Sequence, residues 1–273
     1  MMKAKIDLIK AKNCLINFVF TFFSTVGLNF LLSFVIGPFV IMPIIYKLLY
    51  AIGLISKFYY LHSNQAKVDK MVYGGVLGII FFMILYYVVI KVKSKGDKSK
   101  IISSFNLNKL TWKQIGFYIV FGLISSGMFY SINRFLGTVF IETEKSRTYA
   151  INSMKNSFSF VVFLLGATTI GPIYEELLFR NLVPRKLKKS FSPFWIIIIQ
   201  GLFFGVAHLN IIKFFSTSFL GILTFIIVLW SGSLYAGIII HLTNNNQIFI
   251  QSFIKKVLMK TSNYSDIAVS QLL

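Results

Sequence analysis

The stretch FSFVVFLLGATTIGPIYEELLFR, residues 158–180, decides which kind of fold this chain adopts. It is long enough to cross a bilayer, which takes about 20 predominantly apolar residues in a helix. Two adjacent glutamates, Glu175 and Glu176, interrupt its apolar character, and Arg180 follows close behind. The stretch therefore predicts a transmembrane helix that carries buried charges.

The composition of the whole chain extends this prediction to a polytopic membrane protein. Of the 273 residues, 56% are hydrophobic and only 13% are charged, which lies outside the range of soluble domains. The fold class is therefore all-α, a transmembrane helical bundle that occupies residues 1–273 as a single domain. The apolar runs predict about eight spans, at residues 14–36, 38–61, 71–90, 114–133, 158–182, 194–214, 216–231 and 233–251.

The basic residues indicate membrane lipids as partners rather than nucleic acid. The formal net charge is +20, and the lysines gather in residues 3–12, 91–100 and 185–189, between apolar runs. This pattern is typical of cytoplasmic loops and of attraction to anionic lipid. A nucleic-acid site would need a contiguous basic face. Together with a residue usage typical of AT-rich genomes, it predicts a multi-pass protein of a bacterial cytoplasmic membrane.

The same basic segments expose a conflict in the predicted topology. If residues 3–12 and 91–100 both face the cytoplasm, an even number of crossings must separate them, but three spans are predicted there. One of the first three spans is therefore wrong. The weakest is 38–61, because Lys47 and Lys57 interrupt it.

The acidic residues point to the functional site. Of eight acidic residues, only Glu175 and Glu176 fall inside an apolar span. A charge at bilayer depth costs about 2.5–3.5 kcal/mol on insertion scales, so the pair is a functional hypothesis by default. Glu176 and Arg180 are four residues apart and can meet on one helix face, which leaves Glu175 to face elsewhere. The alternative is an ion pair with a structural role only.

Two histidines also lie in apolar runs, His208 in GLFFGVAHLN and His241 in LYAGIIIHLTNN. Asn245 follows His241 by one helical turn and shares its face. Gly201 and Gly205 precede His208 at a spacing that lets helix backbones approach closely. Three helices could therefore bring the glutamates, both histidines and the asparagine together.

This set of side chains fits hydrolysis of an amide bond by activated water. A glutamate and a histidine can share a water and act as general base. A second histidine and an asparagine supply hydrogen-bond donors for the oxyanion of a tetrahedral intermediate. No covalent nucleophile is required.

The residues resemble the CAAX prenyl protease and bacteriocin-processing (CPBP, or Abi) family of intramembrane proteases. Its motifs EExxxR, FxxxH and HxxxN/B correspond to EELLFR at 175–180, FGVAH at 204–208 and HLTNN at 241–245, in the family's order. The resemblance places the catalytic core at 158–251. One local departure is Asn181, where the family commonly has glycine.

The resemblance also implies roles for the matching positions. Glu175 would activate water together with His208, and Glu176 and Arg180 would organise the site. The remaining pair, His241 and Asn245, would stabilise the oxyanion. The spacing alone leaves open which glutamate activates water.

The resemblance favours a glutamate protease without a cofactor. Glu175, His208 and His241 could chemically bind zinc, which is the alternative to metal-free catalysis. The zinc motif HExxH is absent from the sequence. We therefore expect no cofactor and no metal, with zinc as the second choice.

The predicted function is an intramembrane endopeptidase that cuts a membrane-associated peptide or protein. Its relatives suggest bacteriocin or pheromone processing, or self-immunity to a bacteriocin. A second hypothesis is a non-catalytic membrane immunity factor or scaffold, in which the same residues hold the bundle together. A third, a transporter, is disfavoured because the sequence shows no internal repeat.

Overall fold

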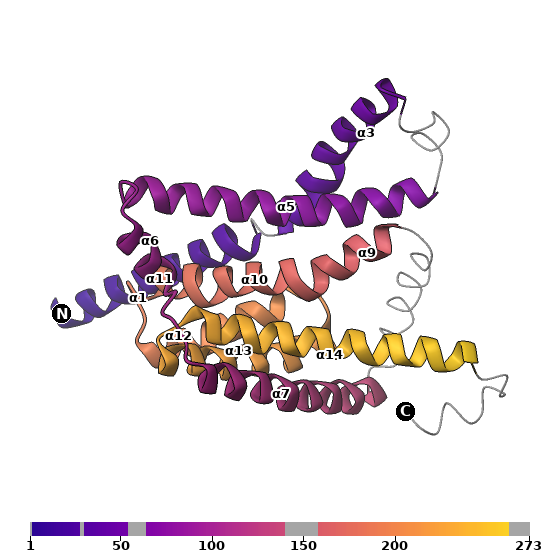
Figure 1. Ribbon diagram of the computed structural model, residues 1–273. Helices are drawn as coiled ribbons and strands as arrows, with labels where there is room; N and C mark the ends of the chain where they lie inside the picture. The colour runs from indigo at the N-terminus through magenta and orange to yellow at the C-terminus, as the bar shows by residue number, and fades with distance from the viewer. Residues whose placement is uncertain (1, 28–29, 54–63, 140–157, 262–273) are drawn as a thin grey trace.

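The chain folds into helices that pack side by side, which confirms the predicted all-α class (Figure 1). The computed structural model describes residues 2–27, 30–53, 64–139 and 158–261, and no strand occurs among them. The first half contains α1 (Met2–Phe22), η1 (Phe23–Gly27), η2 (Leu31–Ile41), α3 (Met42–Ala51), α5 (Asn64–Lys93), α6 (Lys98–Phe105) and α7 (Trp112–Val139). The second half contains α9 (Phe158–Leu165), η3 (Gly166–Ile170), α10 (Gly171–Glu176), η4 (Leu177–Leu182), α11 (Val183–Leu187), α12 (Pro193–Val206), α13 (Ile211–Ser231) and α14 (Leu234–Thr261).

Four of these helical stretches are long and apolar enough to cross a membrane, among the residues that the structure describes. They are Met71–Lys93, Trp112–Leu136, Val161–Leu187 and Ile211–Ser231, and two shorter apolar helices are Val35–Ala51 and Pro193–Val206. Every predicted span overlaps a helix of the structure. The number of spans, about eight, stays a prediction.

The first two predicted spans, 14–36 and 38–61, lead in one direction through the bundle. In Figure 1, α1 begins at one end of the bundle, and α3 ends on the side where α5 begins. Helix α5 then leads back toward the end where α1 begins. This course is compatible with both basic segments, 3–12 and 91–100, on one side of a membrane, and the topology of the first three spans stays a prediction. The predicted helix 38–61 ends earlier, at Ala51, and residues 54–63 lie outside the described chain.

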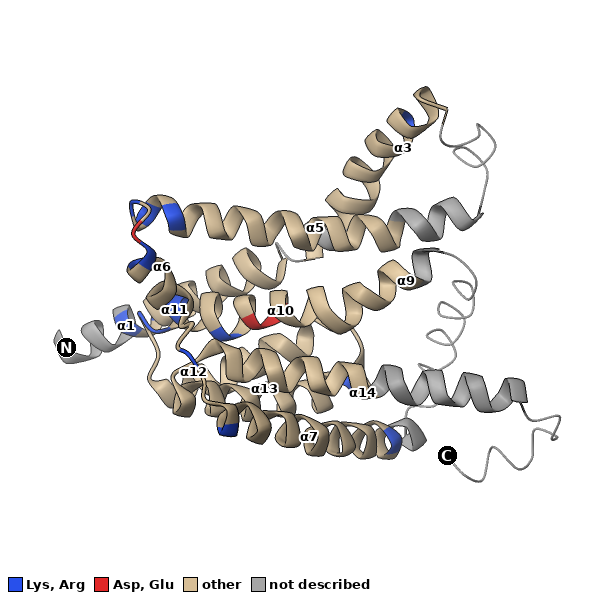
Figure 2. Cartoon of the chain, in the orientation of Figure 1, with Lys and Arg blue, Asp and Glu red and all other residues tan. Residues whose placement is uncertain are grey.

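Lysine and arginine cluster at the end of the bundle where α1 begins, α5 meets α6, and α11 lies (Figure 2). We call this the basic end. Asp97 caps α6 there by accepting from Ser99 N at 2.8 Å, and hydrogen bonds from the Ser99 side chain and the Lys100 and Ser99 backbone lower the pKa of Asp97.

All three tryptophans lie near helix ends at the basic end, and each side chain is exposed. Trp112 begins α7, Trp195 lies in the first turn of α12, and Trp230 lies in the last turn of α13. Tryptophan is enriched where a membrane meets water. Exposed tryptophans and clustered lysines together are typical of a membrane–water interface, which is the position that we expect for the basic end.

The boundary between α12 and α13 differs from the prediction. We predicted one span at 194–214, but α12 ends at Val206 and α13 already begins at Ile211. The reason is an N-cap at Asn210, which starts α13 and which the apolar pattern of the sequence does not reveal. Asn210 has extended backbone angles and accepts from Lys213 N at 3.0 Å, and Leu209 before it has a φ of 50°. His208 therefore lies in a turn instead of inside a helix.

Small residues let α12 and α13 approach closely. A side-chain carbon at Gly201 would lie 2.5 Å from Ile222 and 3.1 Å from the carbonyl oxygen of Ser218. At Gly205 it would overlap the Ser218 hydroxyl and lie 2.7 Å from the carbonyl oxygen of Phe214. The glycine spacing seen in the sequence therefore marks a helix–helix contact.

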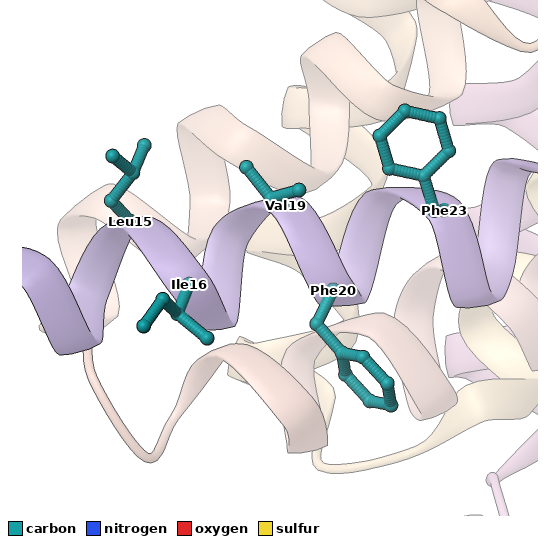
Figure 3. A pocket seen from close by; sticks show the side chains of 5 residues that line it. All are labelled: Leu15, Ile16, Val19, Phe20 and Phe23. Carbon is teal, nitrogen blue, oxygen red and sulfur yellow. The ribbon is translucent and has the colours of Figure 1, made fainter.

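The main buried core joins both halves of the chain. It combines Phe82 and Tyr86 of α5 with residues of α10 to α12, including Tyr174, Phe179 and Phe204. Helix α1 and the start of η1 also present an exposed apolar face. Its side chains line a shallow depression: Leu15, Ile16, Val19, Phe20 and Phe23 (Figure 3). Exposed apolar faces of this kind suit contact with lipid.

Replacing Gly205 with alanine should destabilise the bundle by about 1–3 kcal/mol, because the new methyl group would force α12 and α13 apart. Thermal unfolding in detergent measures the effect. The matched control is Gly116→Ala on α7, where an added carbon meets nothing within 4 Å. Equal melting temperatures for the two variants would contradict the close packing of α12 against α13.

Candidate active site

The two glutamates lie on a helix whose backbone is interrupted on both sides. Helix α10 is only 6 residues long and is flanked by the π-helical segments η3 and η4. Pro172 lacks the N–H that would continue an α-helical ladder, and the N–H of Gly171 bonds instead to the carbonyl of Gly166. Such π-helical segments often occur at functional sites. Figure 2 shows the acidic pair of α10 in the middle of the bundle.

Glu176 is fully buried between a cation and a histidine. Its Oε2 lies 3.3 Å from Nε of Arg180, one turn later, and Oε1 lies 3.0 Å from Nδ1 of His241 on α14. The contact with Arg180 is an ion pair whose angle falls short of a hydrogen bond. The predicted meeting of Glu176 and Arg180 on one face is confirmed.

Gly237 makes room for the Glu176 carboxylate. A side-chain carbon at this position would overlap Oε2 of Glu176 and would lie 2.8 Å from Cγ2 of Val228. Gly237 precedes His241 by one turn, so the same face of α14 supplies both the space and the partner for Glu176. In the sequence, Gly237 follows Ser233 at the spacing of small residues that lets helices pack closely, but this spacing does not reveal the contact with Glu176.

Glu175 has a different environment from its neighbour. Its side chain is 29% exposed, and its Oε2 lies 3.6 Å from Nε2 of His241. His241 therefore stands between the two carboxylates, with one ring nitrogen toward each. If Nδ1 carries the proton and donates it to Glu176, Nε2 is the atom that faces Glu175. The accessible carboxylate of the pair is that of Glu175.

Phe204 is the aromatic centre of the site, a role that sequence reasoning missed. Its ring is 1% exposed and lies 5.0 Å from the ring of His208 and 5.7 Å from that of His241, both edge to face. The Arg180 guanidinium carbon lies 4.4 Å from its centroid, a cation–π contact. The only signal in the sequence was its spacing of one turn before His208.

His208 reaches the site from the turn after α12. Its Nδ1 lies 2.8 Å from the carbonyl oxygen of Phe204, which fixes the ring against that residue. Among the described residues, no hydrogen bond or ion pair joins His208 directly to Glu175 or Glu176. The structure thus brings His208 next to His241 through Phe204, and its cooperation with Glu175 stays a prediction.

Asn245 lies one turn beyond His241 on α14. Its side-chain amide donates to the carbonyl oxygen of Ala167 at 2.8 Å, which is a contact to the backbone of η3. Asn245 therefore faces the helix that bears the glutamates, as predicted from its spacing, but its hydrogen bond in the described part of the chain goes to a backbone carbonyl and not to either carboxylate. Its role as an oxyanion donor stays a prediction.

Asn181 also proves to be part of the supporting structure. Its Oδ1 accepts from the Tyr86 hydroxyl at 2.6 Å, and its Nδ2 donates to the carbonyl of Ser104 at 3.1 Å. The residue is 2% exposed. The position where the sequence departs from the family pattern therefore ties the motif helix to α5 and to α6, a role that a glycine could not fill.

The described side chains do not form a metal site. No group of three or more His, Cys, Asp or Glu with suitable geometry for one ion occurs in the described ranges. Both nitrogens of His241 already face carboxylates, and Nδ1 of His208 faces a backbone carbonyl. The alternative zinc set of Glu175, His208 and His241 therefore does not fit this arrangement.

Fold and site together define a class: a helical membrane protein with a buried cluster of two glutamates, an arginine and two histidines. Comparison with known proteins gives the family. Residues 157–246 match the family model described as "Type II CAAX prenyl endopeptidase Rce1-like". This segment, about a third of the chain, is therefore similar to the CPBP family that the three motifs resemble.

One similar protein is described as "Putative membrane peptidase YdiL" of Bacillus subtilis (strain 168). It is 26% identical over 182 residues, which cover 65% of this chain and 71% of the relative. No solved structure matches the chain significantly. The family match covers all three motifs, so the predicted resemblance is confirmed.

Replacing Arg180 with methionine should lower the stability by about 3–5 kcal/mol, because the buried Glu176 then loses its cation. The double variant Arg180→Met with Glu176→Gln should recover much of that loss, since no uncompensated charge remains. Melting temperatures in detergent measure both. Strictly additive effects in the double variant would contradict the pairing of the two residues.

Proposed function

We propose that the protein is an intramembrane endopeptidase in which Glu175 activates water. The observation that carries this proposal is the difference between two adjacent carboxylates. Glu176 is 0% exposed and is held by Arg180 and His241, whereas the Glu175 side chain is 29% exposed. A general base has to reach its substrate water, and only Glu175 meets this condition.

The proposed reaction is hydrolysis of a peptide bond. Glu175 takes a proton from water, and the hydroxide attacks the amide carbon to give a tetrahedral oxyanion. His208, whose ring lies against Phe204, assists in orienting the water. Asn245 and the doubly protonated ring of His241, through its Nε2–H, donate hydrogen bonds to the oxyanion. The proton then passes to the leaving nitrogen, the C–N bond breaks, and an amine and a carboxylic acid result.

Glu176 and Arg180 contribute by positioning in this mechanism. Glu176 accepts from Nδ1 of His241, which fixes the orientation of the ring and aims Nε2 toward the Glu175 side. Arg180 balances the Glu176 charge, so that a carboxylate tolerates burial. This scheme proposes no cofactor, since a carboxylate that acts as general base can activate water by itself.

The proposed substrate is a membrane-associated peptide or protein, and the proposed location is a bacterial cytoplasmic membrane with the basic end inside. The relative from B. subtilis and the positive-inside tendency support this location. Maturation of a bacteriocin or pheromone, or self-immunity, fits such an enzyme. Membrane lipids are the other partner. A non-catalytic immunity factor or scaffold is the second candidate, because buried ion pairs also hold helices together.

Glu175→Gln should lower peptide cleavage by roughly 10²–10⁴-fold, the usual contribution of a general base. The protein should still accumulate, because the Glu176 pair remains intact. The measurement is mass spectrometry of candidate leader peptides incubated with purified protein, with and without a chelator. A matched control is Thr169→Ala, an exposed residue on the same helical stretch.

Cleavage that survives in Glu175→Gln would reject Glu175 as the base. Cleavage that disappears with chelator would reject the metal-free mechanism. Normal immunity or processing in cells that carry Glu175→Gln, His208→Ala and His241→Ala one at a time would favour the scaffold function instead.

The orientation has its own test. In a Cys14→Ala background, Lys98→Cys at the basic end should react with a membrane-impermeant maleimide only after cells are opened. Ile52→Cys, at the end of α3 and 67% exposed, should react in intact cells. The reverse labelling pattern would place the basic end outside.

A further inference from the structure

The proline next to the glutamate pair leaves backbone carbonyls without their helical donors. In a regular helix the N–H of residue 172 would bond to the carbonyl of Thr168, but Pro172 has no N–H. The N–H of Gly171 would bond to the carbonyl of Ala167, but it bonds to Gly166 instead. Two consecutive carbonyls in an apolar bundle therefore need other donors, since an unpaired polar group there is costly.

Helix α14 supplies both donors from adjacent asparagines. The Asn245 amide donates to the carbonyl of Ala167 at 2.8 Å, and the Asn246 amide donates to that of Thr168 at 3.1 Å. Asn246 also donates to the carbonyl of Leu242 in its own helix at 2.8 Å, which holds its side chain in place. Each carbonyl released by the interruption is thus bonded to one asparagine.

These two bonds set the register between α14 and the helix that bears the glutamates. His241 contacts Glu175 and Glu176. One turn further along α14, the two asparagines donate hydrogen bonds to the backbone of η3. A slide of one helix past the other would break both contacts together. The interruption at Pro172 is therefore a docking point for α14 as well as a local irregularity.

We infer that Asn246 is a positioning residue for the proposed protease, which fixes Glu175 against His241 by replacing the backbone hydrogen bond that Pro172 removes. Asn245 provides the neighbouring contact. The expected effect on kcat rests on the proposed function. The hydrogen bond from Asn246 to the carbonyl of Thr168 is a property of the fold alone. Pro172 and Asn246 are consequently coupled: the asparagine is needed because the proline is present.

The test is a double-mutant cycle of Asn246→Ala and Pro172→Ala in the full-length protein. Asn246→Ala should lower kcat roughly ten-fold with KM changed by less than about two-fold, because a small displacement of a catalytic group slows the chemical step. In the Pro172→Ala background, where an N–H can again bond to the Thr168 carbonyl, the same substitution should change kcat by less than about two-fold.

Thermal unfolding of the same four proteins gives a readout that needs no substrate. Asn246→Ala should lower the melting temperature more in the natural background than in Pro172→Ala. The control is Asn244→Ala, since Asn244 faces α7 and lies 3.5 Å from the Ser125 hydroxyl. Its effect should be the same in both backgrounds. If Asn246→Ala fails to accumulate, Asn246→Leu, which is similar in size and lacks the donor, replaces it in the cycle.

Coupling in both readouts supports the inference. Coupling in the melting temperatures of a protein that cleaves no peptide supports the bond replacement and rejects the protease function alone. Equal effects of Asn246→Ala in the two backgrounds, or no effect in the natural one, would overturn the inference even if the natural protein cleaves its peptide.

Discussion

The site depends on the burial of one carboxylate, that of Glu176, at a depth where a lone charge is unstable. Arg180 balances its charge, His241 donates to its other oxygen, and Gly237 leaves the space that it occupies. These partners come from two helices that are distant in sequence, so the ion pair also joins α10 to α14. A buried pair of this kind adds little net stability compared with apolar packing. Its value lies in holding His241 in a single orientation.

Adjacent residues on one helix can have opposite functions because their environments differ. Glu175 and Glu176 are the same chemical group, but a turn of about 100° sends them to different surroundings. The desolvated member becomes a fixed part of the scaffold, and the accessible member remains free to exchange protons with water. Sequence spacing predicted that Glu176 meets Arg180, but it left open which of the two glutamates activates water.

Much of the fold and the site follows from the sequence, for physical reasons that particular residues show. Apolar length predicted the helices, and the cost of charge in lipid singled out Glu175 and Glu176. The end of α12 was placed wrongly because His208 and Asn210 lie in an almost continuous apolar run, where a single cap outweighs hydropathy. The spacing of Phe204 one turn before His208 was visible in the sequence, but its contacts to Arg180 and His241 were not, because those residues lie on other helices.

The helix that carries Glu175 and Glu176 is interrupted by η3 and η4, and the hydropathy of the sequence gives no sign of these interruptions. In a continuous α-helix the backbone N–H and carbonyl groups bond to each other, so the interior of the helix needs no hydrogen-bond donors from neighbouring helices. At Pro172 the carbonyls of Ala167 and Thr168 lose their donors within the helix, and side chains of α14 supply donors in their place. Docking of α14 in this register therefore supplies hydrogen bonds that the helix with the glutamates cannot form by itself. The interruption thus ties the formation of its backbone to the assembly of the site, since the same docking brings His241 between the two glutamates.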